Sequence, residues 1–224
     1  MSEKIIVAID GPAGSGKSTV AKKLAEKMGC LYLDTGAMYR AITYCSLKNG
    51  IIDNHEAIVE LARSIDLHLE FEKGLTRVFV DGLEITEEIR SMEVSSKVSE
   101  VSTISKVREE LVKLQRMFGE KGSLITEGRD TTTVVFPHAD VKVYLTASVE
   151  IRAKRRFREF QAKKSDITLE EVLENIKKRD RIDSSRETSP LTEAPDAIHF
   201  DNTSFTVEED INKLYHIIKD RLKI

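Results

Sequence analysis

A glycine-rich octapeptide near the start of the chain constrains the fold more than any other feature. Residues 11–18 read Gly-Pro-Ala-Gly-Ser-Gly-Lys-Ser, which matches the pattern G-x-x-x-x-G-K-S. An apolar run at residues 5–9 precedes it, and apolar residues at helical spacing follow it as far as Gly29. In this setting, a buried strand passing through glycines into an amphipathic helix, the pattern forms a phosphate-binding loop. The sequence therefore predicts an α/β fold.

The residue types of the octapeptide suit a polyphosphate and a hard cation. Glycines let backbone N–H groups wrap an anion, and the first turn of the helix adds a favourable dipole. The amine of Lys17 is expected to bridge the β- and γ-phosphates of a bound nucleotide, and the hydroxyl of Ser18 to ligate Mg²⁺. The predicted ATP-binding residues are Gly11, Pro12, Ala13, Gly14, Ser15, Gly16, Lys17, Ser18 and Thr19.

The same loop occurs in kinases, GTPases and motor ATPases, so other motifs must separate these classes. A GTPase reads its base with an N-K-x-D motif, but Asn212-Lys213 is followed by Leu214 and Tyr215 within an amphipathic helical pattern. The sequence also contains no D-x-x-G switch motif. These two observations argue against a GTPase.

Short apolar segments recur along the chain, separated by helical patterns. Buried strands are predicted at residues 30–33, 123–126, 141–146 and 197–200, in addition to 5–9. Helices are predicted around residues 107–118 and 207–222, where apolar side chains recur at spacings of three and four. Alternating strands and helices predict a five-stranded parallel sheet flanked by helices.

Residues 65–86 break this rhythm with a period-two alternation of apolar and polar side chains. Lys73-Gly74 and Asp81-Gly82 are turn signals within this segment. A small antiparallel β meander is therefore predicted as an insertion into the α/β fold.

Charge and composition exclude several partners. The 224 residues include 35 Lys and Arg against 38 Asp and Glu, a net charge of −3, so neither nucleic acid nor a membrane is expected as a partner. No apolar stretch approaches about 18 residues, and the chain starts without a signal sequence, which predicts a cytoplasmic protein. Cys30 and Cys45 are expected to be reduced and buried. Without an apolar heptad seam, a monomer is expected.

Arginines follow two of the predicted strands. Arg40 ends the segment 34–40 after the second strand, and Arg129 and Asp130 follow the strand at 123–126. Because α/β proteins bind ligands at the carboxyl ends of parallel strands, these side chains are expected to line one crevice, where guanidinium groups match phosphate. The alternatives are a helix cap at Thr35 beside a solvated Arg40, and a surface ion pair between Arg129 and Asp130.

Two further groups of charged residues lie at helical spacing. Arg179, Asp183 and Arg186 would share one helix face and form a clamp for phosphate and hydroxyl groups, unless they are solvated charges paired with Asp180 and Glu187. A basic run comprises Arg152, Lys154, Arg155, Arg156 and Arg158, followed by Lys163-Lys164. Its residues 152, 155 and 156 share a face that could close over a transferring phosphoryl group. An RNA-contacting patch and a solvated face are the alternatives.

Taken in order, these segments resemble the bacterial cytidylate kinase family of nucleoside monophosphate kinases. The resemblance runs nearly end to end. It rests on Asp10-Gly-Pro-Ala-Gly-Ser-Gly-Lys-Ser18, Asp34-Thr-Gly-Ala-Met-Tyr-Arg40, Ile89-Arg90 with Val94, Val107-Arg108-Glu109, Gly128-Arg129-Asp130 with Thr133-Val-Val-Phe-Pro137, and Arg179-Asp180 through Arg186. It implies a P-loop kinase fold and Mg²⁺-dependent phosphorylation of CMP, and of dCMP, by ATP. Two alternatives stay open: a kinase that phosphorylates another acceptor, such as UMP or a hydroxylated metabolite, and a nucleotide-binding module that contacts RNA.

The resemblance also implies roles for individual residues. Ser99, Arg108 and Asp130 match residues that read the cytosine ring, and Arg179 and Asp183 match contacts to the sugar. The acceptor phosphate would be bound by Arg40, Arg129 and Arg186, with Thr35 completing the CMP site. The residues implied in catalysis are Lys17, Arg129, Arg152, Arg156 and Arg179, and those implied in reaching Mg²⁺ through water are Asp34 and Glu127.

The resemblance divides the chain into three parts. Residues 1–60, 91–150 and 188–224 would form the kinase core, residues about 63–90 an inserted β region for the nucleoside monophosphate, and residues about 151–187 a basic helical lid. Three positions depart from the usual pattern: Thr132 and Lys164 stand where the family commonly has glycine, and Glu127 where many members have aspartate.

Overall fold

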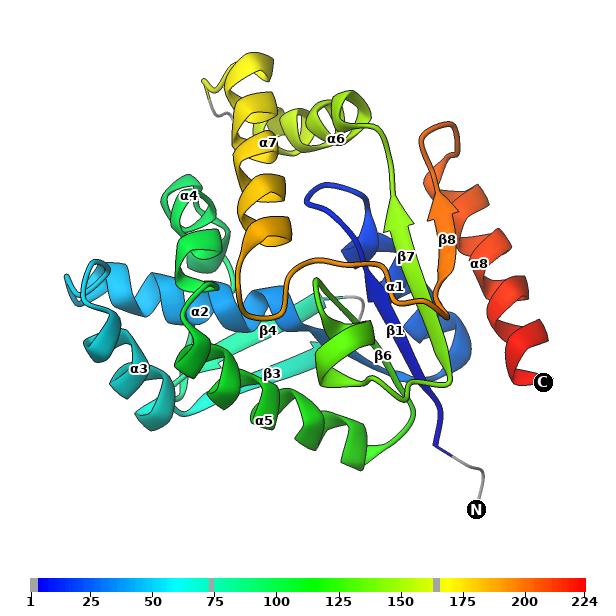
Figure 1. The fold of residues 1–224 in the computed structure, drawn as a ribbon, viewed down its shortest axis with the longest axis horizontal. Coiled ribbons are helices and arrows are strands. Elements are labelled where there is room, and N and C mark those ends of the chain that lie inside the picture. Colours follow the sequence, from blue (N-terminus) through cyan, green and yellow to red (C-terminus); the bar gives the residue numbers. More distant parts are fainter. Residues whose placement is uncertain (1–3, 73–74, 163–165) are drawn as a thin grey trace.

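The computed structural model describes residues 4–72, 75–162 and 166–224 and alternates strands with helices (Figure 1). The strands are β1 (Ile6–Asp10), β2 (Leu31–Asp34), β3 (Leu67–Glu72), β4 (Leu75–Val80), β5 (Leu83–Glu84), β6 (Leu124–Gly128), β7 (Val141–Thr146) and β8 (Ile198–Asp201). The α-helices are α1 (Lys17–Met28), α2 (Thr35–Lys48), α3 (His55–Ser64), α4 (Met92–Val101), α5 (Ser105–Lys121), α6 (Val149–Ala162), α7 (Leu169–Ser185) and α8 (Val207–Leu222). A 3₁₀ turn, η1 (Glu88–Arg90), and a π-helical turn, η2 (Thr131–Val135), complete these elements.

The main sheet is parallel and has the strand order β2-β6-β1-β7-β8. This confirms the five predicted strands and the parallel arrangement. Four of them begin one residue later than predicted and end one or two residues later, because pairing with a neighbouring strand holds the later residues extended. Asp10, for example, is paired with Gly128 across β1 and β6.

Helices cover both faces of the main sheet (Figure 1). On one face, side chains of α1 and α8 such as Leu24 and Leu214 pack with Val7 and Ile9 of β1. On the other face, α2 and α5 pack against Leu33 and Leu124. Helix α1 ends at Gly29, as predicted, where the backbone is left-handed at φ 65°. These layers hold the carboxyl ends of the parallel strands at one edge.

The predicted antiparallel meander forms a small sheet of order β3-β4-β5. Its register pairs Leu67 with Val80, and buried side chains such as Val78 pack with α2 in the core. The turn at Asp81-Gly82 has positive φ at both residues, 50° and 78°, as a type I′ hairpin requires. The predicted turn at Lys73-Gly74 lies outside the described residues.

Helices α6 and α7 lie together above the carboxyl ends of the strands (Figure 1). A small core of their own, formed by Ala153, Phe160, Val172 and Ile176, holds them against each other. Helix α7 begins with a capping box at Thr168, which fixes its first turn. The predicted Lys163-Lys164 segment lies outside the described residues.

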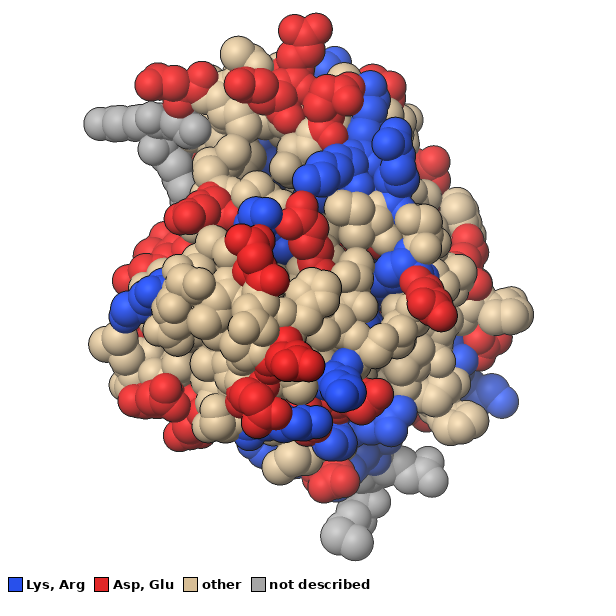
Figure 2. Space-filling view, turned by 60° about the vertical axis from the view of Figure 1, so that its left-hand side comes forward, with Lys and Arg blue, Asp and Glu red and all other residues tan. Residues whose placement is uncertain are grey.

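Both cysteines are free. Cys45 is buried in the core, as predicted, whereas Cys30, between the end of α1 and the edge strand β2, is only partly buried and packs against the core from its margin. In the described residues, no helix combines the length and apolar character needed to cross a bilayer. On the face in Figure 2, acidic and basic side chains are interspersed.

Candidate active site

The predicted phosphate loop, residues 11–18, connects β1 to α1. Its three glycines all have positive φ: 152° at Gly11, 75° at Gly14 and 95° at Gly16. A Cβ atom built on Gly11 would lie 2.0 Å from the carbonyl oxygen of Leu145 in β7. Glycine is therefore required here both by backbone conformation and by the close approach of a neighbouring strand.

Lys17 folds back onto this loop. Its Nζ donates to the carbonyl oxygen of Pro12 at 2.9 Å and lies 3.5 Å from the Ser15 hydroxyl. Burial, reinforced by the positive charge of Arg129, lowers the pKa of Lys17 to about 7. A bound polyphosphate would add anionic charge beside Lys17 and favour its protonated form.

Two arginines of α6 support the loop from above. Arg152 donates to the carbonyl oxygen of Ala13 at 3.1 Å and pairs with Asp180 of α7 at 2.6 Å. Arg155 donates to the carbonyl oxygen of Ser15 at 3.2 Å and to Asn202 at 2.9 Å. Both guanidinium groups therefore contact the backbone of the phosphate loop.

Arg156 points elsewhere. Its guanidinium lies 3.3 Å from the Ser95 hydroxyl of α4 and pairs with Glu159 at 2.6 Å. The three arginines of α6 thus do not converge on one point: Arg152 and Arg155 contact the phosphate loop, and Arg156 extends toward α4. A solvated face, one alternative for the basic run, does not describe these contacts.

A cavity lies beside the phosphate loop at the carboxyl ends of β2 and β6, and we call it the acceptor cavity. It brings together all nine predicted CMP-binding residues. Its lining consists of Thr35, Gly36, Tyr39, Arg40, Val98, Ser99, Ser102, Arg108, Gly128, Arg129, Asp130, Arg179, Asp183 and Arg186. These residues come from β6, α2, α4, α5, α7 and the segments that follow β6, α4 and α7.

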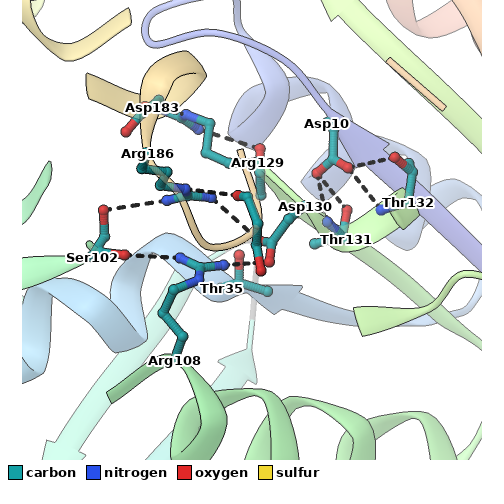
Figure 3. Close-up of polar contacts among 12 residues, drawn as sticks. Asp10, Thr35, Ser102, Arg108, Arg129, Asp130, Thr131, Thr132, Asp183 and Arg186 are labelled. Atoms are coloured by element: carbon teal, nitrogen blue, oxygen red, sulfur yellow. Dashed lines mark hydrogen bonds and ion pairs between the residues drawn. The ribbon is translucent and has the colours of Figure 1, made fainter. Parts of the chain in front are cut away.

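Asp130 is the central carboxylate of this cavity (Figure 3). Arg108 donates a short charged hydrogen bond to it, and the Arg186 guanidinium lies 4.0 Å away. Both arginines also contact Ser102, at 3.1 Å to its carbonyl oxygen and 3.3 Å to its hydroxyl. Among the described residues, Nε of Arg108 and one terminal nitrogen of Arg186 have no hydrogen-bond partner. The guanidinium donors of Arg108 and Arg186 are thus buried beside the carboxylate acceptor of Asp130.

Arg129 and Asp183 form the second ion pair of the cavity. Nε of Arg129 donates to Asp183 at 2.9 Å (Figure 3). Burial opposes ionisation of Asp183, but Arg129 and Arg179 outweigh it and lower the pKa of this carboxyl group. Nε of Arg179 is buried and has no partner in the described part of the chain. This cation is available to a ligand.

Arg40 lies where several positive charges meet. It donates to the Ser95 hydroxyl at 3.0 Å and to the carbonyl oxygen of Ile89 at 3.4 Å. Burial, together with the charges of Arg179 and Arg156, lowers the pKa of Arg40 to about 9. Burial and Arg129 likewise lower the pKa of Arg179 to about 10. The cluster therefore favours an anion, which would relieve the repulsion between these cations.

The alternatives considered for Thr35 and Arg40 do not hold. Asp34, rather than Thr35, caps α2, because its carboxylate accepts from the backbone N–H of Ala37 at 2.9 Å. Thr35 is the first helical residue and donates to the carbonyl oxygen of Glu127 at 2.7 Å. Arg40 is engaged with Ser95 instead of solvent. Asp180 was the alternative ion-pair partner for the arginines at 179 and 186, and in the structure it pairs with Arg152 of α6.

Hard oxygen atoms suited to Mg²⁺ surround the start of α1. The hydroxyl of Ser18 donates a short hydrogen bond to Glu127, and Tyr32 donates to the same carboxylate oxygen at 3.1 Å. Burial, together with the negative charge of Asp34, raises the pKa of Glu127. Within the described residues, no three His, Cys, Asp or Glu side chains form a metal cage. This donor set fits Mg²⁺, which takes one or two protein ligands beside phosphates and water.

Several supporting residues escaped the sequence analysis. Asn202 donates to the carbonyl oxygen of Ser15 at 3.0 Å and accepts from Arg155. It directly follows β8, so the rule that ligand sites lie at carboxyl ends of strands could have indicated it. Tyr32 and Ser95 carry no comparable signal, because their roles depend on which helix or strand packs beside them.

A family model described as cytidylate kinase matches residues 7–220. The chain belongs to the cytidylate kinase family. A cytidylate kinase of Caldanaerobacter subterraneus is 52% identical over 97% of this chain and 96% of its own length. A cytidylate kinase of Bacillus subtilis is 46% identical over 99% of both chains.

This cytidylate kinase assignment confirms the resemblance carried by the sequence motifs. Solved structures of lower similarity share the fold alone. A gluconokinase from Sinorhizobium meliloti is 12% identical and superposes with a TM-score of 0.52, covering 98% of this chain and 95% of that one. This likeness shows the fold alone, because one fold can carry unrelated functional sites.

Proposed function

We propose that this protein transfers the γ-phosphoryl group of ATP to CMP, and to dCMP, forming CDP and dCDP. The observation that carries the proposal is the buried pairing of Asp130 with Arg108 in the acceptor cavity, beside the arginine cluster and the phosphate loop. Cytidylate kinases of similar sequence, matched over nearly the whole chain, support CMP as the acceptor.

Cytosine fits the polarity of this part of the cavity. Its edge presents an N4 amino donor beside the N3 and O2 acceptors. The Asp130 carboxylate would accept from N4, while Arg108 and Ser99 would donate to the ring acceptors. Uracil carries a carbonyl oxygen in place of the amino group, so it would face the carboxylate with a second acceptor. This mismatch explains selection of CMP over UMP in the proposal.

The rest of the acceptor would occupy the cationic part of the cavity. Asp183 and Arg179 are suited to the sugar, because one offers acceptor oxygens and the other a free donor. Arg40, Arg129 and Arg186 would bind the phosphate, whose charge compensates the repulsion among the arginines. Thr35 completes this side of the cavity.

Phosphoryl transfer between two nucleotides requires alignment and charge neutralisation, and no covalent enzyme intermediate. We assign the catalytic role to Lys17, Arg129, Arg152, Arg156 and Arg179, the cations around the phosphate loop and the adjoining cavity. Lys17 would contact the transferring group, and Arg152 would hold the loop at Ala13. Movement of residues about 151–187 as a lid over the core, toward the inserted region at about 63–90, would exclude water.

Mg²⁺ would be held by Ser18, with Asp34 and Glu127 reaching it through water. Ser18 and Glu127 are already in contact, so these oxygens lie within a shared site. The ion would neutralise negative charge on the β- and γ-phosphates. We further propose a cytoplasmic monomer that binds neither nucleic acid nor membranes.

Release of ADP from ATP and Mg²⁺ tests the function directly, with CMP, dCMP, UMP, AMP, GMP or shikimate supplied singly. Turnover with CMP and dCMP in preference to the others is expected. Turnover with another acceptor alone would retain the kinase chemistry and refute the assigned acceptor. No turnover with any acceptor, together with salt-sensitive RNA binding, would favour a binding module instead.

The role of Asp130 is tested by Asp130→Ala. Loss of the acceptor for N4 is expected to raise KM for CMP about tenfold or more while KM for ATP changes less than about twofold, because a charged hydrogen bond is lost at one substrate only. Glu60→Ala is a matched control, since it also removes a carboxylate paired with an arginine, Arg63, at the surface and outside the site. Equal increases in both KM values would refute base reading by Asp130.

A further inference from the structure

Asp10, the last residue of β1, is fully buried and accepts four hydrogen bonds from two consecutive threonines. One carboxylate oxygen accepts from the backbone N–H of Thr131 at 2.9 Å and from its hydroxyl at 2.7 Å. The other accepts from the backbone N–H of Thr132 at 2.7 Å and from its hydroxyl at 2.6 Å (Figure 3). A carboxylate offers about four lone-pair sites, so this arrangement uses all of them.

These four hydrogen bonds to Asp10 fix the segment that carries Asp130. Strand β6 ends at Gly128, which is paired with Asp10 in the sheet. Arg129 and Asp130 then line the acceptor cavity, and the next two residues return to the Asp10 carboxylate. Asp130 is therefore held between the sheet on one side and Asp10 on the other. The peptide of Asp10 leads directly into the phosphate loop at Gly11.

The π-helical turn η2 adds to this restraint. The backbone N–H groups of Val134 and Val135 both donate to the carbonyl oxygen of Asp130, at 2.9 and 3.1 Å. π-Helical turns are rare and often occur at functional sites. The turn is thus closed on the carbonyl of Asp130, and its first two residues are bound to Asp10, so the backbone that carries the Asp130 side chain is held on both sides.

Three consecutive threonines, 131–133, supply an internal comparison. The hydroxyls of Thr131 and Thr132 both bind Asp10, whereas the Thr133 hydroxyl is buried without a hydrogen-bond partner among the described residues. Packing alone does not require the first two hydroxyls, since valine has the same shape as threonine. Their position on Asp10 instead indicates a restraint on the segment.

We propose that Asp10 is a positioning residue for acceptor recognition, acting through the hydroxyls of Thr131 and Thr132 on the orientation of Asp130. The inference rests on the proposed function through the assigned role of Asp130. It adds a link between the start of the phosphate loop and the base-reading carboxylate, which would hold donor and acceptor sites in fixed relation. Thr132 contributes to this link a hydroxyl that glycine at the same position would lack.

The test compares Thr131→Val and Thr132→Val, singly and combined, with Thr133→Val as the matched control. The double variant keeps both backbone donors but removes two of the four hydrogen bonds. We expect KM for CMP to rise about fivefold and the ratio of kcat/KM for CMP over UMP to fall by a similar factor. KM for ATP should stay within about twofold, and Thr133→Val should match the unmodified protein in all three quantities.

Asp10→Asn removes the charge and presents an amide to donors, so a larger effect is expected, provided the variant folds. The threonine variants keep the proposal testable if it does not. An unchanged CMP/UMP ratio in the double variant would overturn the positioning role, and so would equal increases in KM for CMP and ATP. Asp130→Ala is measured in the same series: if it alone changes the ratio, the link fails but base reading stands. If Asp130→Ala leaves the ratio unchanged, base reading itself fails.

Discussion

ATP binding by this protein should be accompanied by proton uptake above neutral pH, because Lys17 is largely uncharged before the phosphates arrive. Burial and the positive charge of Arg129 lower its pKa to about 7 in the nucleotide-free protein. Phosphate groups placed against Nζ would favour the ammonium form and return the pKa toward or above its ordinary value of 10.5. Binding would then draw one proton from solution for every uncharged Lys17.

The magnitude follows from the fraction of Lys17 that is uncharged. With a pKa of about 7, about half of the nucleotide-free protein carries the neutral amine at pH 7 and about nine-tenths at pH 8. Because the bound form would be fully charged, uptake should rise from about 0.5 proton per ATP at pH 7 to about 0.9 at pH 8. Proton uptake also implies that ATP affinity weakens as pH rises through this interval.

Isothermal titration calorimetry without an acceptor measures this directly. The apparent binding enthalpy is determined in buffers of different ionisation enthalpy, and the slope gives the number of protons taken up. Lys17→Met, which keeps an unbranched side chain without the amine, serves as the control and should show no rise between pH 7 and 8. Uptake near zero in the unmodified protein at pH 8, or the same uptake in the variant, would refute the argument.

Two further changes probe the phosphate loop. Gly11→Ala should lower the free energy of unfolding by more than about 2 kcal/mol, because the new Cβ would collide with a backbone oxygen of β7. Gly29→Ala is the control: its Cβ meets nothing, so it should lower the free energy of unfolding by about 1 kcal/mol. Urea unfolding measures both. Similar losses for both would contradict the collision. Asp180→Asn should weaken the support that Arg152 gives to Ala13 and raise KM for ATP about tenfold, with a smaller effect on KM for CMP. Steady-state kinetics in which CMP is affected more would disprove this assignment.

The sequence predicted local structure and the chemical class well, because both depend on residues near one another in the chain. Apolar runs specified the five parallel strands, and period-two alternation specified the inserted meander. The octapeptide 11–18 required a loop between a strand and a helix, since only glycines tolerate its positive φ values. Arginines after two strands and on α7 indicated an anion site, because carboxyl ends of parallel strands meet at one edge.

Only the tertiary structure decided which of these charged residues act together. The strand order β2-β6-β1-β7-β8 places Asp10 beside a segment about 120 residues further along the chain, and no local pattern encodes that neighbour. The same applies to Arg155 with Asn202 and to Tyr32 with Glu127. Helical spacing grouped Arg152, Arg155 and Arg156 on one face, but packing of α6 over the phosphate loop sent them to different partners. Local periodicity determines which elements form, whereas the contacts of a buried charge depend on which distant element desolvates it and supplies its hydrogen bonds.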